Sequence, residues 1–129
     1  MNNGETTGKG MYWTGVVITA VVALFMSMAI FMELTKGQQV VEGMAKYGYP
    51  ESVIQGIGVA LLVSTVLYVI PRTTVLGAIL LTGYFGGAVS THVRAQEMQA
   101  VMPVLIGALT WAGVFFRDAR VRQLLPWRK

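Results

Sequence analysis

The stretch YWTGVVITAVVALFMSMAIFM, residues 12–32, contains no charged side chain. The hydrocarbon core of a bilayer is about 30 Å thick and takes about 20 apolar residues in an α-helix. A helix that is apolar on every side needs lipid, or a much larger protein core, around it. The stretch therefore predicts a membrane-spanning helix. Only Lys9 is basic before it and no Ala-x-Ala site follows, so we expect a retained helix rather than a cleaved signal peptide.

Three further stretches have the same apolar character, at residues 52–70, 73–93 and 101–116. Pro50 and Pro71 bound the first of them, and the last is the shortest and ends at Arg117. Together the four stretches predict an all-α fold, a bundle of four transmembrane helices that forms a single membrane domain over the whole chain. A basic cytoplasmic tail, residues 117–129, would follow the last helix.

The composition excludes several classes of function. Charged residues make up 12% of the chain, whereas a soluble domain carries about 25%. Cysteine is absent, which excludes disulfide chemistry, thiolate metal ligands and cysteine nucleophiles. His92 is the only histidine, and zinc sites need three or four ligands, so we expect no metal. No nucleic-acid-binding motif accompanies the net charge of +4, and we expect no nucleic-acid partner.

The basic residues predict how the helices are oriented. With the N-terminus inside, the inner side would hold seven Lys and Arg and the outer side three, namely Lys36, Lys46 and Arg94. Because basic residues accumulate in cytoplasmic loops, we expect both termini in the cytoplasm. Aromatic residues near the ends of the predicted spans are typical of the belts at membrane–water interfaces: Tyr12, Trp13, Tyr68, Trp111 and Trp127.

Half of the basic residues lie in the tail. These five of the ten Lys and Arg are Arg117, Arg120, Arg122, Arg128 and Lys129. Leu124, Leu125 and Trp127 lie between them. Basic side chains next to a membrane helix attract anionic lipid, so the tail is predicted to anchor at the lipid surface. The alternative is a tail that docks a soluble partner.

The loop between the first two predicted helices has a pattern of its own. Val40, Val41, Met44 and Tyr47 recur at the spacing of one helical face. This pattern predicts a short amphipathic helix that lies on the outer surface or caps the bundle. The sequence Gly48-Tyr49-Pro50 then predicts a turn that returns the chain to the membrane.

Rows of small residues predict where helices pack. In lipid, small side chains allow close approach of backbones, and this replaces the hydrophobic drive of soluble proteins. The second and third predicted helices carry such rows, at Gly56, Ala60, Ser64, Gly83, Gly86, Gly87 and Ser90. We expect these residues to pack helices within the chain, with the third helix at the centre. The alternative is that one row forms the contact of a homodimer.

Polar residues gather at the predicted outer end of the bundle. They are Glu33, Gln55, Tyr84, Thr91, His92 and Arg94. As a site, they would bind a quinone head group, another small ligand or a proton, because histidine as a residue type exchanges protons near neutral pH and Arg94 could pair with Glu33. The alternative is that they mark the water interface, where long polar side chains reach solvent. A hydrolase triad is not expected, since Ser90 and His92 are two residues apart and do not face each other on a helix.

The chain resembles the DoxX-like family of small four-helix membrane proteins. The resemblance rests on VVEG at 40–43, GYP at 48–50, LYVIPRT at 67–73 and LGAILLTGYFGGAVSTHVR at 76–94. The resemblance implies a multi-pass protein of a cell membrane, which we expect to be the bacterial inner membrane. It also implies a role as a membrane subunit in redox or sulfur metabolism. Two positions depart from the family pattern. Many relatives have Lys where this chain has Glu33 and Glu where it has Leu61, so this chain cannot form that pair between its first two helices.

The sequence therefore favours a non-catalytic membrane subunit or scaffold that binds a quinone or lipid-like ligand and contacts a partner subunit. The alternative is a small homodimeric, proton-coupled transporter that uses Glu33. That mechanism needs an acidic residue at mid-membrane, whereas Glu33 follows the apolar stretch. The depth of Glu33 separates the two hypotheses.

Overall fold

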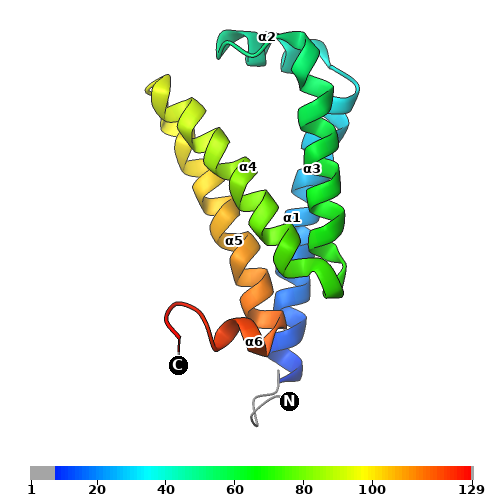
Figure 1. The fold of residues 1–129 in the computed structure, drawn as a ribbon, viewed down its shortest axis with the longest axis vertical. Helices are drawn as coiled ribbons and strands as arrows, with labels where there is room; N and C mark the ends of the chain where they lie inside the picture. Colours follow the sequence, from blue (N-terminus) through cyan, green and yellow to red (C-terminus); the bar gives the residue numbers. More distant parts are fainter. Residues whose placement is uncertain (1–7, 129) are drawn as a thin grey trace.

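The structure, a computed structural model, describes residues 8–128, and these form helices joined by short turns (Figure 1). The long helices are α1 (Lys9–Leu34), α3 (Ile54–Val69), α4 (Thr74–Arg94) and α5 (Val101–Arg117). The short helices are α2 (Gln38–Lys46) and α6 (Ala119–Arg122), and the 3-10 turns are η1 (Glu51–Val53), η2 (Pro71–Thr73) and η3 (Met98–Ala100). The described part of the chain contains no strand, so the predicted all-α class is confirmed.

Four segments are long and apolar enough to cross a membrane. They are Lys9–Leu34, Glu51–Val69, Pro71–Arg94 and Met98–Arg117. Each one contains or nearly matches a predicted stretch. The fourth is longer than predicted, because η3 adds Met98–Ala100 before α5. The predicted helix in the first loop is also present, as α2.

The turn between α3 and α4 follows from its proline. The residue before a proline is disfavoured in the helical region, and Ile70 accordingly has an extended ψ of 123° and ends α3. Two threonines then satisfy carbonyl groups at the end of α3, which have no partner within the helix. Thr73 Oγ1 donates to the Leu67 carbonyl at 2.8 Å, and Thr74 Oγ1 donates to the Tyr68 carbonyl. The turn therefore holds α3 and α4 together at this end.

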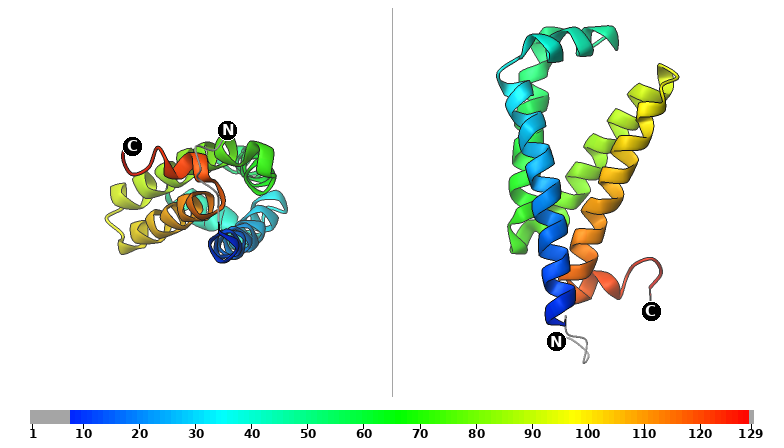
Figure 2. Two further views of the ribbon diagram at one scale, coloured as in Figure 1. Left: turned by 90° about the horizontal axis from the view of Figure 1, so that it is seen from below. Right: turned by 180° about the vertical axis from the view of Figure 1, so that it is seen from behind.

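The helices form two pairs that diverge. α1 packs against α3, α4 packs against α5, and the pairs meet through α1 with α5 and α3 with α4. Figures 1 and 2 show the pairs close together where the two termini lie and separated at the other end, where α2 crosses. We call the first the terminal end and the second the α2 end. The divergence opens space between the pairs at the α2 end.

Buried apolar side chains run along the inside of the bundle. They are Val22, Met26, Ile30, Leu61, Tyr68, Ala78, Leu81, Phe85, Val114 and Val121. Near the terminal end the backbones approach at glycines. A Cβ on Gly77 would overlap the Tyr68 backbone, and one on Gly113 would lie 2.7 Å from Tyr68 Oη. Tyr68 is fully buried and donates to the Thr110 carbonyl at 2.9 Å, so its predicted place in an interfacial belt is wrong.

Most residues of the predicted small-residue rows do not lie at these close helix contacts. Within residues 8–128 a Cβ on Gly56, Gly83, Gly86 or Gly87 would meet nothing within 4 Å, and Ala60 and Ser90 are exposed. Only Ser64 of the predicted set is buried. The exposed residues precede the closest contacts on α3 or follow them on α4, where the helix pairs diverge. The predicted close packing of these residues within the chain is therefore not found, and their use in a dimer stays a prediction.

Candidate functional site

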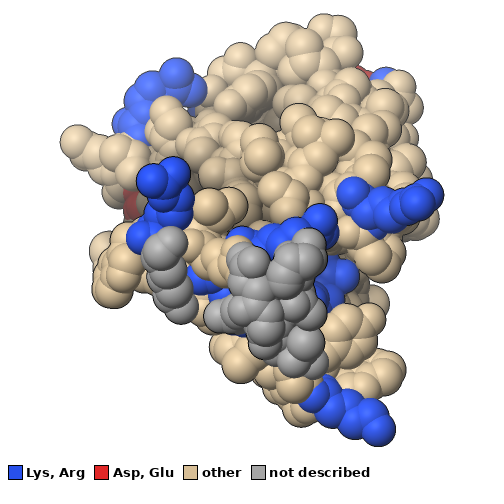
Figure 3. All heavy atoms as spheres, turned by 60° about the horizontal axis from the view of Figure 1, so that its bottom comes forward, with Lys and Arg blue, Asp and Glu red and all other residues tan. Residues whose placement is uncertain are grey.

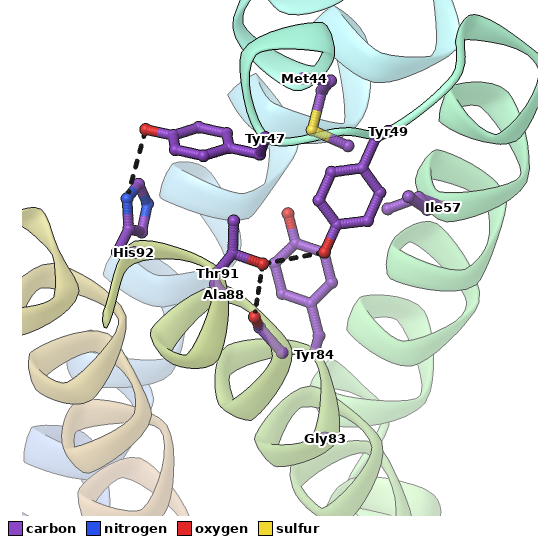
Figure 4. A pocket seen from close by; sticks show the side chains of 10 residues that line it. Met44, Tyr47, Tyr49, Ile57, Gly83, Tyr84, Ala88, Thr91 and His92 are labelled. Atoms are coloured by element: carbon purple, nitrogen blue, oxygen red, sulfur yellow. Dashed lines mark hydrogen bonds between the residues drawn. The ribbon is translucent and has the colours of Figure 1, made fainter. Parts of the chain in front are cut away.

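A cavity lies between the two helix pairs at the α2 end. Its volume is about 330 Å³, and its walls come from α2, the α2–α3 connection, α3 and α4 (Figure 4). It is lined by Met44, Tyr47, Tyr49, Ile57, Gly83, Tyr84, Gly87, Ala88, Thr91 and His92. We call it the α2-end cavity. It combines an apolar wall with three tyrosine rings and one imidazole.

The α4 wall is shaped by two glycines. Gly83 and Gly87 both line the cavity, and a Cβ on either would meet no atom within 4 Å. Their missing side chains therefore leave volume in the cavity, while Ala88 and Ile57 keep the surroundings apolar. In the sequence these small residues predict close packing of helices. In the structure they help to form the cavity instead.

Hydroxyl groups supply the polar part of the cavity. Tyr49 Oη and Thr91 Oγ1 are 2.8 Å apart, and Thr91 Oγ1 also donates to the Gly87 carbonyl at 2.9 Å (Figure 4). Tyr84 Oη donates to Glu33 Oε1 at 2.9 Å. Each hydroxyl is therefore held in place by a neighbour on another element or by the helix backbone. Ordered hydroxyls of this kind fix the orientation of a ligand.

Glu33 lies behind the cavity, against Tyr84. Its side chain is buried, and Oε2 has no hydrogen-bond partner among the described residues. The burial results from close approach of α1 and α3, since a Cβ on Gly58 would lie only 3.0 Å from Glu33 Cβ. A buried polar atom without a partner is uncommon in proteins. Glu33 is the penultimate residue of α1, so it lies near the end of that helix.

Four polar side chains join α2 to the turn between α4 and α5. Glu97 accepts from Tyr47 Oη at 2.5 Å and from Lys46 Nζ at 2.9 Å, and His92 Nδ1 lies 2.8 Å from Glu97 Oε1. Arg94 adds a hydrogen bond of 3.3 Å to the Tyr47 carbonyl. We call Lys46, Tyr47, His92 and Glu97 the Glu97 cluster. It connects the two helix pairs across the side on which they diverge.

The cluster holds Glu97 ionised. The hydrogen bond from Tyr47, followed by those from Lys46 and His92, lowers the pKa of Glu97 from 4.5 to about 2. The same bond to Glu97 raises the pKa of the Tyr47 hydroxyl. If His92 donates from Nδ1 to the carboxylate, its Nε2 is left as an acceptor, because neutral imidazole has one donor and one acceptor nitrogen. In that tautomer His92, which lines the cavity, retains an acceptor nitrogen.

The structure brings together part of the predicted outer set. Tyr84, Thr91 and His92 line the cavity, and Glu33 supports Tyr84. Gln55 does not line it: its amide donates to the Leu34 carbonyl at the end of α1 at 3.0 Å. Arg94 is exposed and pairs with the Tyr47 backbone, not with Glu33 as predicted.

Three important residues were not predicted as part of the site. Tyr47 and Tyr49 lie in the first loop, and Glu97 lies in the turn between α4 and α5. The signal for the tyrosines was present, since Tyr47 belongs to the amphipathic pattern and Tyr49 to the predicted turn. Glu97 has no such signal, because its partners Lys46 and Tyr47 are about fifty positions away in the sequence.

The described members of the predicted lipid-anchoring set lie at the terminal end, where Lys and Arg gather (Figure 3). Arg117 points into the bundle and donates to Thr74 Oγ1 and, at 3.4 Å, to the Tyr68 carbonyl. Arg122 is buried and donates to the Phe115 carbonyl at 2.6 Å. Arg120 and Arg128 are exposed, and Lys129 lies outside the described residues. Arg117 and Arg122 therefore support the fold of this end.

The four apolar helices define a multi-pass α-helical membrane protein. The sequence model of the DoxX-like family matches residues 17–113, which is more than half of the chain. The protein belongs to the DoxX-like family, as predicted. The match runs from α1 into α5 and includes all residues that line the α2-end cavity. No curated protein and no solved structure matches the chain.

Proposed function

We propose that this DoxX-like membrane protein is a non-catalytic membrane subunit or scaffold that binds a quinone or lipid-like ligand in the α2-end cavity. The proposal rests on one observation, a cavity of about 330 Å³ with an apolar wall and ordered hydroxyl groups. Small-molecule sites are mostly apolar clefts of about 300–1,000 Å³ with a few fixed polar groups. The size and lining of the cavity agree with that description.

The lining favours a neutral, partly aromatic ligand. Of residues 8–128, no Asp, Glu, Lys or Arg lines the cavity, while Tyr47, Tyr49 and Tyr84 offer ring faces and edges. Aromatic rings prefer edge-to-face or offset contacts with another ring. A quinone or quinol head group has a flat ring with oxygens on opposite sides. Thr91 donates to the Gly87 carbonyl, so in the bond between them the Tyr49 hydroxyl donates to Thr91. The oxygens of Tyr49 and Thr91 and, in the tautomer that donates from Nδ1, Nε2 of His92 therefore supply acceptors, which suit the hydroxyl groups of a quinol.

The cavity can be filled by a single substitution on α4. Gly87→Leu places a side chain in the cavity, and no atom within 4 Å opposes the new Cβ. Gly86→Leu is the matched control, because Gly86 is equally open on the same helix but does not line the cavity. Native mass spectrometry of protein released from mild detergent should show a retained small-molecule mass with wild type and Gly86→Leu, and loss of about tenfold or more with Gly87→Leu. Equal retention by both variants, or no retained mass in the wild type supplied with a quinone, would contradict the proposal.

A second candidate is the homodimeric, proton-coupled transporter that uses Glu33. The observation that favours it is the buried Glu33 side chain, whose Oε2 finds no hydrogen-bond partner in the part of the chain that the structure describes. Ionisable residues inside membrane proteins commonly mark ion pathways. Against it stands the position of Glu33 next to the last residue of α1, at the α2 end. We therefore place this candidate second.

A further inference from the structure

A second hollow lies at the opposite end of the molecule, between α5 and the C-terminal tail, residues 118–128. Its volume is about 390 Å³, and its wall on α5 carries Trp111, Phe115 and Phe116. Leu125 of the tail faces that wall. We call this hollow the tail groove. Its lining is almost entirely apolar, and it has no residue in common with the α2-end cavity.

The walls of the tail groove are fixed by hydrogen bonds. Trp111 Nε1 donates to Thr82 Oγ1 on α4 at 2.7 Å, which sets the indole ring. Arg122 donates to the Phe115 carbonyl at 2.6 Å, which holds the start of the tail beside α5. Leu125 N donates to the Val121 carbonyl at 3.0 Å, a bond within the tail that fixes the turn carrying Leu125. A groove that is formed before binding costs its ligand less entropy.

The groove has a direction. Its liners on α5 extend from Ala108 to Phe116, about 12 Å along a helix with a rise of about 1.5 Å per residue. The Phe116 end lies beside the basic tail at the terminal end, and the Ala108 end lies toward the middle of α5. A lipid with its head group at the terminal end would thus lay an acyl chain along the groove toward the bilayer interior.

Charge at the terminal end selects the head group. Arg120 and Arg128 are exposed on the tail, and Lys9 and Arg72 lie at the same end of the bundle. Among the described residues, the acidic residue at this end is Asp118. Its carboxylate pairs with Arg120 at 3.2 Å. The positive excess is visible in Figure 3. Guanidinium groups match the geometry of phosphate oxygens.

We propose that the tail groove binds one acyl chain of an anionic phospholipid, whose phosphate contacts the exposed arginines of the tail. This binding is distinct from ligand binding in the α2-end cavity. It gives the basic tail a defined lipid site in place of a diffuse attraction to the membrane surface. The tail thereby fixes one lipid against α5 in the leaflet at the terminal end.

The test compares two lipids that differ only in the head group. Native mass spectrometry with added phosphatidylglycerol or phosphatidylcholine of identical acyl chains measures bound lipid on wild type and variants. Ala108→Phe fills the groove, and Ala20→Phe, on the exposed face of α1, is its control. We expect wild type and Ala20→Phe to bind phosphatidylglycerol preferentially and Ala108→Phe to lose this binding. Arg128→Gln should reduce the preference about fivefold, since one basic residue near an anionic surface contributes that factor.

Arg128→Gln lies outside the helices, so it tests the proposal even if Ala108→Phe fails to fold. Equal binding of the two lipids by wild type would overturn the proposal. So would unchanged phosphatidylglycerol binding by Ala108→Phe. A dimer that is present in wild type and lost in Ala108→Phe would assign the groove to a second copy of the chain and would overturn it as well.

Discussion

Tyr68 shows why single residues are hard to place from sequence in a membrane bundle. An aromatic residue near the end of a span is predicted at the water interface, yet Tyr68 is fully buried. Its hydroxyl reaches the Thr110 carbonyl, and its ring fits where Gly77 and Gly113 have no side chain. Glycines occur on several faces of these helices, and the sequence does not tell which glycine meets a neighbouring helix. The exposed Gly83 and the closely packed Gly77 look alike in the sequence.

For a single residue, the structure predicts how substitution of Glu33 changes the stability of the protein. Glu33→Ala removes the acceptor of the Tyr84 hydroxyl, whereas Glu33→Gln keeps an oxygen in that position. A buried hydrogen-bonding group that loses its partner costs about 1–3 kcal/mol. We expect Glu33→Ala to lower the free energy of unfolding by about this amount and Glu33→Gln to lower it less. Thermal or denaturant unfolding of the purified protein in detergent measures both.

The same residue separates the two candidate functions. Glu51→Gln is the control, because Glu51 is exposed and pairs with Lys36 at 3.3 Å. As a ligand-binding subunit, the protein should show no proton uptake that depends on Glu33 when it is reconstituted in vesicles. Proton uptake by wild type and Glu51→Gln that is absent in Glu33→Gln would favour the transporter instead.

At the scale of elements, most of the helices that could be predicted from the sequence were predicted from the length of an apolar stretch. The four spans and α2 follow from patterns within one segment, namely an uninterrupted apolar run or the spacing of Val40, Val41 and Met44. The contacts between segments do not follow from such patterns. The position of α2 depends on Glu97 in a turn that is distant in the sequence. No pattern in the sequence of either segment indicates that the two are in contact.

The attachment of α2 can be tested with Glu97→Gln. The substitution removes the carboxylate that pairs with Lys46 and His92, so α2 should separate more often from the α4–α5 turn. We expect the amides of residues 38–46 to exchange with solvent faster, on the order of tenfold, while those of α3 and α4 keep their rates. Hydrogen exchange read by mass spectrometry gives both rates.

Glu42→Gln serves as control in that experiment. Glu42 is exposed on α2 and contacts only Gln38 of the same helix among the hydrogen bonds of the described residues. Faster exchange in Glu42→Gln to the same extent would mean that α2 responds to its own helix stability and not to the Glu97 cluster.

At the scale of the whole molecule, the Glu97 cluster links stability to pH. The pKa of Glu97 is about 2 in the folded chain and 4.5 ordinarily, so the unfolded chain binds more protons between these values. The stabilisation is therefore complete above pH 4.5 and is lost as the pH falls toward 2. We expect the midpoint of thermal unfolding of wild type to exceed that of Glu97→Gln at pH 7, and the difference to shrink below pH 4.5. A difference that is constant from pH 7 to pH 3 would show that the carboxylate charge is not the cause.

The divergence of the helix pairs was outside the reach of the sequence, and it has a consequence for the surrounding lipid. The bundle is narrow where the termini lie and broad where α2 crosses. A wedge of this form takes up unequal areas in the two leaflets of a membrane. Many copies inserted in one orientation would expand one leaflet more than the other. The bilayer would bend to relieve this difference in area. We therefore expect a protein of this shape to favour curved over flat membrane, to an extent set by the divergence of its helix pairs.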